Sequence, residues 1–344
     1  MTSSTPTAAA ANAAPRTFAF DAYVTDALID GSPSAAGQAV FALGDGQVAW
    51  ADGVRGEAHD GAVLCAAAHP SGDGVVTGGD DGRVVWSRRA GDGVEQAVLA
   101  ELKGRWIDAL ATSADSGLVA FAAGRDVHVR DVDDARFERR FTHDKSVAGL
   151  AFDPKGRRLA AATYGGVALW YARIAEQKPV MLKWAGSHVA VAFSPDGKFL
   201  LSAMQENALH GWRLSDAKDM RMGGYPAKIK SLAFLENGLW LATSGANGVV
   251  LWPFQGANGP MGKQANEIGF DESALVARLS AEPGRTLLAA GLDDGRVWVC
   301  DLKTQRLETL KADKGPPISA LVLKGDAVAW GDEEGGAGVA PVPF

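Results

Sequence analysis

The chain has 344 residues, of which 47% are hydrophobic and 22% charged, so it can bury a core and lacks the composition of a disordered protein. Its formal net charge of −7, with no basic stripe along the sequence, argues against binding to nucleic acid or to an anionic membrane. The two cysteines, Cys65 and Cys300, lie in apolar runs, which indicates small core residues in a reducing compartment rather than a disulfide framework.

The N-terminal segment has the composition of a tail. Residues 1–15 are small, polar or alanine-rich, and they lack the basic and bulky apolar residues of a secretory signal. No run in the sequence reaches the length of a membrane span. We therefore expect residues 1–16 to be disordered, residues 17–344 to form one domain, and the protein to be cytoplasmic.

After this tail, a short alternating run from Thr17 to Tyr23 leads into a repeated unit. The unit contains an apolar strand, a turn, a second apolar strand, a second turn and a third strand that often ends in tryptophan. Proline, aspartate, asparagine and glycine dominate the first turns, as in Pro154-Lys155-Gly156 and Pro195-Asp196-Gly197, because they adopt turn geometry at low cost.

The second turns recur at intervals of about 40 residues, and such a period is typical of a propeller with four strands in each blade. Their central residues are Gly46, Gly82, Gly124, Gly166, Asn207, Gly248, Gly295 and Gly335. The third strands end with a bulky ring that can pack between neighbouring blades. These residues are Trp50, Trp86, Trp170, Trp212 and Trp252, with Arg130 and Cys300 at the equivalent places of two other units.

Several units resemble WD repeats. The segment AHDGAVLCAAAHPSGDGVVTGGDDGRVVW, residues 58–86, is similar to a nearly complete one, and residues 142–170 and 189–212 are similar in the same way. The resemblance extends from about Thr17 to Phe344 and is closest to small stand-alone bacterial WD-repeat proteins. It implies an all-β, closed β-propeller of four-stranded antiparallel blades. Because this fold serves many roles, it implies little about function.

Eight units can be counted, so the sequence predicts eight blades, with seven as the alternative if the first unit is irregular. The last unit ends at the C-terminus without an outer strand. We expect Thr17–Tyr23 to supply that strand and to close the ring, as in other WD-repeat propellers. An open ring would leave two unpaired strand edges, which promote aggregation.

The resemblance also implies a polar network inside one unit. His59, Thr77, Asp81 and Trp86 match the family's constellation of a histidine, a hydroxyl, an aspartate and the repeat tryptophan. We interpret these four residues as structural, because buried polar groups are normally paired.

No motif of a catalyst is present. The sequence has no Gly-x-Ser-x-Gly elbow, no phosphate loop and no zinc or EF-hand spacing. Acidic pairs such as Asp80-Asp81 and Asp293-Asp294 fall in hairpin turns, where these residues are common. We therefore expect a protein that is not an enzyme, binds no cofactor and has no metal site.

The expected function is that of a non-catalytic scaffold that binds a protein or peptide on the propeller's top face and is monomeric on its own. Loops entering the inner strands and the second turns share this face, and aromatic and basic residues there have the composition of an interface. The candidates are Trp106, Arg125, Lys145, Tyr164, His188, Glu206, Lys228 and Asn247. The alternative is a site for a small ligand or metal, with or without catalysis, at the central channel.

Overall fold

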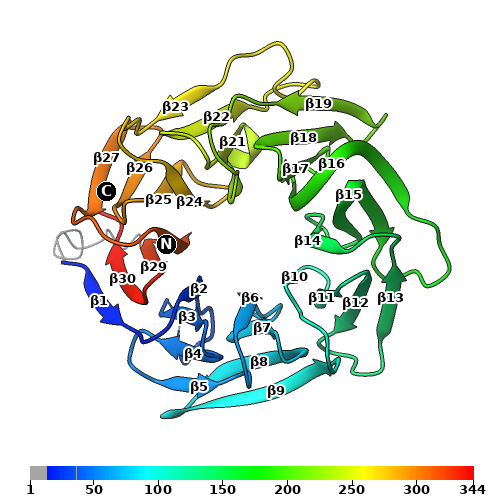
Figure 1. Ribbon diagram of the computed structural model, residues 1–344, viewed down its shortest axis with the longest axis horizontal. Coiled ribbons are helices and arrows are strands. Elements are labelled where there is room, and N and C mark those ends of the chain that lie inside the picture. The colour runs from blue at the N-terminus through cyan, green and yellow to red at the C-terminus, as the bar shows by residue number, and fades with distance from the viewer. Residues whose placement is uncertain (1–13, 36) are drawn as a thin grey trace, which may run out of the picture.

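The computed structural model describes residues 14–35 and 37–344, which form a ring of β-sheets around a central axis (Figure 1). Each blade runs from an inner strand at the axis to an outer strand at the rim. Strands with few polar residues form the inner and middle positions, because both of their faces pack against other blades. No helix in this part of the chain is long and apolar enough to cross a membrane.

The strands of the first half of the ring follow one another in short antiparallel units. They are β1 (Arg16–Ala19), β2 (Val24–Ile29), β3 (Ala39–Leu43), β4 (Gln47–Trp50), β5 (Arg55–Glu57), β6 (Val63–Ala68), β7 (Val75–Gly79), β8 (Arg83–Ala90), β9 (Gly93–Glu101), β10 (Ala109–Ser113), β11 (Leu118–Ala123), β12 (Asp126–Asp131), β13 (Glu138–Thr142), β14 (Val147–Phe152) and β15 (Arg158–Tyr171).

The second half contains the one 3-10 helix of the described residues, η1 (Glu236–Gly238). Its strands are β16 (Val180–Phe193), β17 (Phe199–Met204), β18 (Ala208–Arg213), β19 (Lys218–Met222), β20 (Leu232–Leu235), β21 (Trp240–Thr243), β22 (Val249–Pro253), β23 (Asn266–Ile268), β24 (Val276–Ala281), β25 (Leu287–Leu292), β26 (Val297–Asp301), β27 (Arg306–Lys311), β28 (Ile318–Lys324), β29 (Ala327–Asp332) and β30 (Gly336–Pro341).

The described strands form seven sheets, six with four strands and one with six, in the order β14-β15-β16-β17-β18-β19. The prediction of eight separate four-stranded blades is therefore wrong. The number of sheets equals the alternative of seven, but for a different reason. The first unit is a regular four-stranded blade, and it is the fourth and fifth sequence units that share one sheet.

Two strands of 14 residues cause this merger. The first part of β15 pairs with β14 and its last part with the start of β16, whereas the end of β16 pairs with β17. Gly165 and Gly166 have φ of +90° and +144°, and the β15–β16 ladder shifts register between Tyr164 and Gly166. No loop separates the outer strand of one unit from the inner strand of the next.

The ring is closed by its two ends, as the sequence predicted. β1 pairs antiparallel with β30, with Arg16 opposite Val339 and Ala19 opposite Gly336, so blue and red strands meet in Figure 1. The paired segment is shorter than the expected run and begins one residue earlier. Arg16 therefore belongs to the fold and not to the predicted tail, while residues 1–13 lie outside the described part.

Six inner strands carry a bulge at the same place, one residue after they begin: β2, β6, β14, β16, β24 and β28, where β16 is counted from His188. A bulge increases the twist of a strand and shifts the side chains that follow it. The residues after the bulges therefore lie at equivalent places along the channel. Asp26, Cys65 and Arg278 are three of them.

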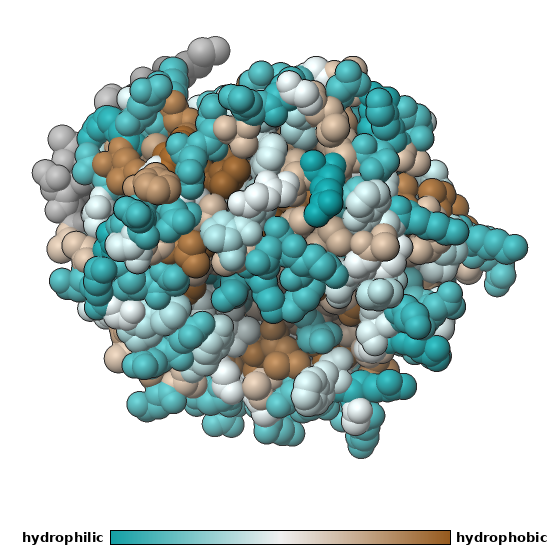
Figure 2. Space-filling view, turned by 45° about the horizontal axis from the view of Figure 1, so that its top comes forward, coloured by the Kyte–Doolittle hydropathy of each residue, from teal (hydrophilic) through white to brown (hydrophobic). Residues whose placement is uncertain are grey.

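Hydrophobic residues fill the space between blades. Every residue of β11 and β17 is buried. The side chains of Trp50, Trp212 and Trp330 are almost fully buried as well. Cys300 is also buried at its repeat position. The surface in Figure 2 is mostly hydrophilic, with hydrophobic residues in a few recessed patches. The core thus lies as wedges between sheets rather than at one centre.

Candidate functional site

Six of the eight candidate partner-binding residues have exposed side chains. Trp106 is 67% exposed and Tyr164 is 65% exposed, values that are unusual for rings of this size in a monomer. Trp106 stands in the connection that leads into β10, whereas Tyr164 lies within β15, opposite Ser187 of β16. The other four are Arg125, Lys145, Glu206 and Lys228.

Two of these residues line one recess of about 410 Å³ between the third and fourth sequence units. Lys145 and Tyr164 stand at its wall together with Met181, which is 43% exposed. The recess therefore combines a flexible apolar side chain, an aromatic ring and a cation. No ion pair of Lys145 occurs within the described residues.

The floor of the recess is fixed by buried hydrogen bonds. Trp170 Nε1–H donates to His143 Nε2 at 2.9 Å, and His143 Nδ1–H donates to the Arg125 carbonyl at 3.1 Å. Both ring nitrogens of His143 are therefore hydrogen-bonded when the ring is neutral. Burial lowers the pKa of His143, which favours this neutral form. The base of the recess is held by these hydrogen bonds, and the long side chains of Lys145 and Met181 form part of its wall.

Two candidates have side chains engaged within the fold, and the prediction for the buried His188 is corrected. His188 is fully buried, with Nδ1 2.5 Å from Ser202 Oγ and Nε2 3.1 Å from the Trp184 carbonyl, because the inner strand turns it into the sheet interior. The Asn247 side chain is half-buried and donates to the Ala274 carbonyl at 2.9 Å, so it braces the next connection.

The predicted polar network forms around three of its four residues. His59 Nδ1–H donates to Asp81 Oδ1 at 3.0 Å, and His59 Nε2 lies 2.8 Å from Thr77 Oγ1. Burial lowers the pKa of His59. Despite partial burial, hydrogen bonds from Arg83 and His59 hold the pKa of Asp81 below its usual range.

Trp86 does not join that network, which corrects the prediction. Its Nε1–H donates to the Asp73 carbonyl at 2.6 Å, and its ring stacks on His69 with 4.3 Å between centroids. The turn before β7 contains Asp73 and places its carbonyl within reach of the ring. The spacing that matches the family's constellation does not reveal this competing acceptor.

A related network that the sequence did not reveal lies in the β20–β23 blade. Trp252 Nε1–H donates to Tyr225 Oη, which donates to Thr243 Oγ1, both at 2.6 Å. Burial raises the pKa of Tyr225 to about 12, so its hydroxyl keeps its proton. A tyrosine here replaces the histidine, and the hydroxyl residue on the second strand was the signal that would have found it.

The central channel holds an uneven set of charges. Burial raises the pKa of Asp26 to about 6, against the effect of Arg278. Burial also raises the pKa of the Cys65 thiol, and the carboxylates of Asp108 and Asp26 add to this effect. Within the described residues, no group of three or more histidine, cysteine, aspartate and glutamate side chains is placed to hold a metal ion.

Comparison with known proteins connects this geometry to a family. A model of the WD domain, G-beta repeat, matches residues 54–86. WD repeat-containing protein 55 from Homo sapiens is 25% identical over 197 residues, which are 55% of this chain and 50% of that protein. An uncharacterized WD repeat-containing protein from Synechocystis sp. is 26% identical over 189 residues, or 41% of this chain and 54% of that protein. The chain spans about half the length of the curated relatives it matches.

Two solved structures share the fold. The computationally designed Ika8 protein superposes with a TM-score of 0.73 at 19% identity, covering 94% of this chain and 97% of that one. The β-propeller domain of Cps50 (Swd1) from Myceliophteria thermophila has a TM-score of 0.64 at 16% identity, covering 81% and 96%. The chain therefore folds as a β-propeller, and the resemblance to a WD repeat is confirmed for residues 54–86.

Proposed function

We propose that this propeller is a non-catalytic scaffold that binds a protein or peptide segment on the face where Lys145 and Tyr164 lie. The observation that carries the proposal is the recess these two residues share with Met181. Tyrosine supplies a large contact area at a small entropic cost, and methionine adapts to different partners. Exposed Arg125 and Trp106 extend the same end of the ring toward the preceding unit.

The absence of catalysis is part of the proposal, and the state of the usual catalytic side chains supports it. Burial raises the pKa of both cysteines, which disfavours a nucleophilic thiolate. His59, His143 and His188 are held in buried hydrogen bonds. Burial between aromatic rings lowers the pKa of His210 to about 4, so it is a poor base near neutral pH. We expect no bound cofactor.

We assign the scaffold to the bacterial cytoplasm as a monomer that recruits an unidentified partner. The two free cysteines support a reducing compartment. The acidic net charge supports a protein partner rather than nucleic acid.

Affinity capture from the native cell tests the scaffold function. A Lys145→Glu, Tyr164→Ala variant should lose a partner that the unchanged protein retains. Tyr171→Ala is the matched control, because Tyr171 is 53% exposed at the other end of the same strand. Partner loss in the control as well, or retention in the double variant, would exclude this face.

The channel remains a second candidate, and one observation favours it. Asp26 and Arg278 place opposite charges at equivalent positions of two inner strands, so a small zwitterion would find both of its charges matched. Equilibrium dialysis against small amino acids should then show binding that Asp26→Asn abolishes. Equal retention of the amino acid by both proteins would eliminate the channel site.

A further inference from the structure

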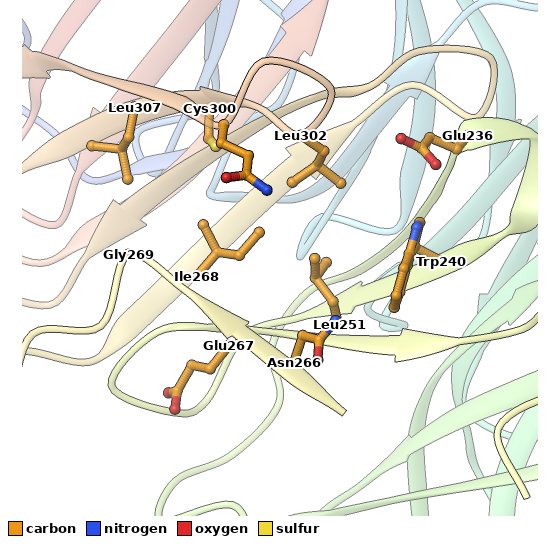
Figure 3. Close-up of a pocket in the computed structure, with 11 residues that line it drawn as sticks. Glu236, Trp240, Leu251, Asn266, Glu267, Ile268, Gly269, Cys300, Leu302 and Leu307 are labelled. Carbon is orange, nitrogen blue, oxygen red and sulfur yellow. The ribbon is translucent and has the colours of Figure 1, made fainter. Parts of the chain in front are cut away.

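The rim of the ring contains a second cavity, of about 520 Å³, between the β20–β23 blade and the β24–β27 blade (Figure 3). It is lined by η1 and by strands β21, β22, β23, β26 and β27, and it is separate from the recess at Tyr164. Its lining residues are Glu236, Trp240, Leu251, Asn266, Glu267, Ile268, Gly269, Cys300, Leu302, Gln305 and Leu307.

The cavity lies beside a short outer strand. β23 has three residues, and they pair only with Val249, Val250 and Leu251. The remaining residues of β22, Trp252 and Pro253, have no partner strand on the outer side among the described residues. In the β6–β9 blade, by contrast, the outer strand pairs along the whole of β8. Trp252 is partly exposed and Pro253 is buried, and the cavity lies beside the paired part of β22, at Leu251.

One end of the cavity carries a carboxylate beside an aromatic ring. Figure 3 shows Glu236 next to Trp240, with Leu302 and Leu251 between them and the far end. No ion pair or side-chain hydrogen bond of Glu236 occurs within the described residues. The backbone of Glu236 is in the left-handed region, with φ of +49°. Its N–H donates to the Arg285 carbonyl at 2.9 Å, and this hydrogen bond fixes the position of the Glu236 backbone.

The charges of this cavity select a cation. Its lining contains two glutamates and no lysine or arginine. Glu267 lies at the other side and accepts the Gly248 N–H at 2.8 Å, so Glu236 is the carboxylate free to meet a ligand. Arg306, between two lining residues, pairs instead with Glu308. A carboxylate next to an aromatic face is a favourable site for a guanidinium group, which forms paired hydrogen bonds and stacks on rings.

We propose that this cavity binds the arginine side chain of a partner peptide, with the guanidinium group between Glu236 and Trp240. The aliphatic part of the arginine lies over Leu251 and Leu302. Leu307, which is 41% exposed, extends the apolar wall toward the rim and contacts an apolar neighbour in the peptide. The occupant is thus an arginine flanked by aliphatic residues.

The test uses the full chain and the acetylated, amidated pentapeptide Ala-Leu-Arg-Leu-Ala, with binding measured by isothermal titration calorimetry at low salt. Replacing the arginine with neutral, isosteric citrulline should weaken binding about tenfold. Glu236→Gln should weaken binding of the arginine peptide by a similar factor and leave the citrulline peptide unaffected. Trp240→Leu should weaken the arginine peptide as well.

Glu176→Gln is the matched control, because it removes the same charge from an exposed site in another blade. It should leave the affinity unchanged, and the melting temperature of each variant reports folding. Failure of the pentapeptide to bind at millimolar concentration would overturn the proposal. So would equal binding by Glu236→Gln, or a dimer in sedimentation velocity that Glu236→Gln dissociates, since the groove would then hold a second copy.

Discussion

The β6–β9 blade and the β20–β23 blade each pair a buried threonine hydroxyl, but with different residues. Each has a threonine on its second strand, Thr77 or Thr243, whose hydroxyl lies 3.3 Å from the opposite carbonyl of the third strand. In the first blade the hydroxyl meets His59, and in the second it meets Tyr225. The fold therefore requires a partner for a buried hydroxyl and not a particular side chain.

The outer strands of the same two blades differ more strongly. β9 has nine residues and pairs along all of β8, whereas β23 has three. Neighbouring blades constrain the inner strands on both faces, but the outer strand of each of these two blades is hydrogen-bonded to only one strand. Its length can therefore vary without opening the ring, and the cavity at Glu236 lies beside the shorter strand.

The largest expected difference between the two blades lies in their polar networks. Tyr225→Ala should lower the free energy of unfolding by about 4 kcal/mol, because it removes a buried ring as well as two hydrogen bonds. His59→Ala removes a smaller side chain and should cost about 2 kcal/mol. Urea denaturation measures both, and equal losses would contradict this ranking.

The inner strands of the two blades differ in the charges near them. All residues of β20 are apolar, whereas Cys65 on β6 has the carboxylate of Asp26 nearby. The folded pKa of Asp26, about 6, exceeds the usual value near 4, so the folded state binds the extra proton and loses stability as the pH rises from 4 to 6. Asp26→Asn should therefore stabilise the protein by about 1–2 kcal/mol at pH 7.5 and by little at pH 4. Thermal unfolding across this range measures the difference, and a pH-independent effect would disprove it.

Double-mutant cycles should separate the two tryptophans. Trp252 donates to Tyr225, so Trp252→Phe and Tyr225→Phe should show a coupling of about 1 kcal/mol. Trp86 donates to the Asp73 carbonyl instead, so Trp86→Phe and His59→Ala should be additive within about 0.3 kcal/mol. Coupling of the second pair would mean that Trp86 belongs to the His59 network after all.

The smallest effect should come from the long outer strand. Val98 is 55% exposed on β9, so Val98→Ala should change the free energy of unfolding by less than about 0.5 kcal/mol. A loss above 1 kcal/mol would show that β9 contributes to the core, and would weaken the comparison with β23.

Local patterns in the sequence were enough for the fold type, the ring closure and part of one polar network. The 40-residue period and turn residues predicted the propeller, and the alternating run after the tail predicted the strand beside β30. The eight sequence units did not predict seven sheets, because the merger of two units depends on how β15 and β16 pair. Nor did the aligned position of His188 reveal that its ring is turned into the sheet.

Turn geometry, strand alternation and the residues that recur in each unit depend on neighbours along the chain, so they can be predicted from the sequence. Other features depend on contacts between distant segments, so they are visible only in the folded ring. These are the acceptor of Trp86, the burial that raises the pKa of Asp26, and the open cavity at Glu236. Burial and hydrogen-bond pairing are properties of the packed ring, and residues far apart in sequence create them.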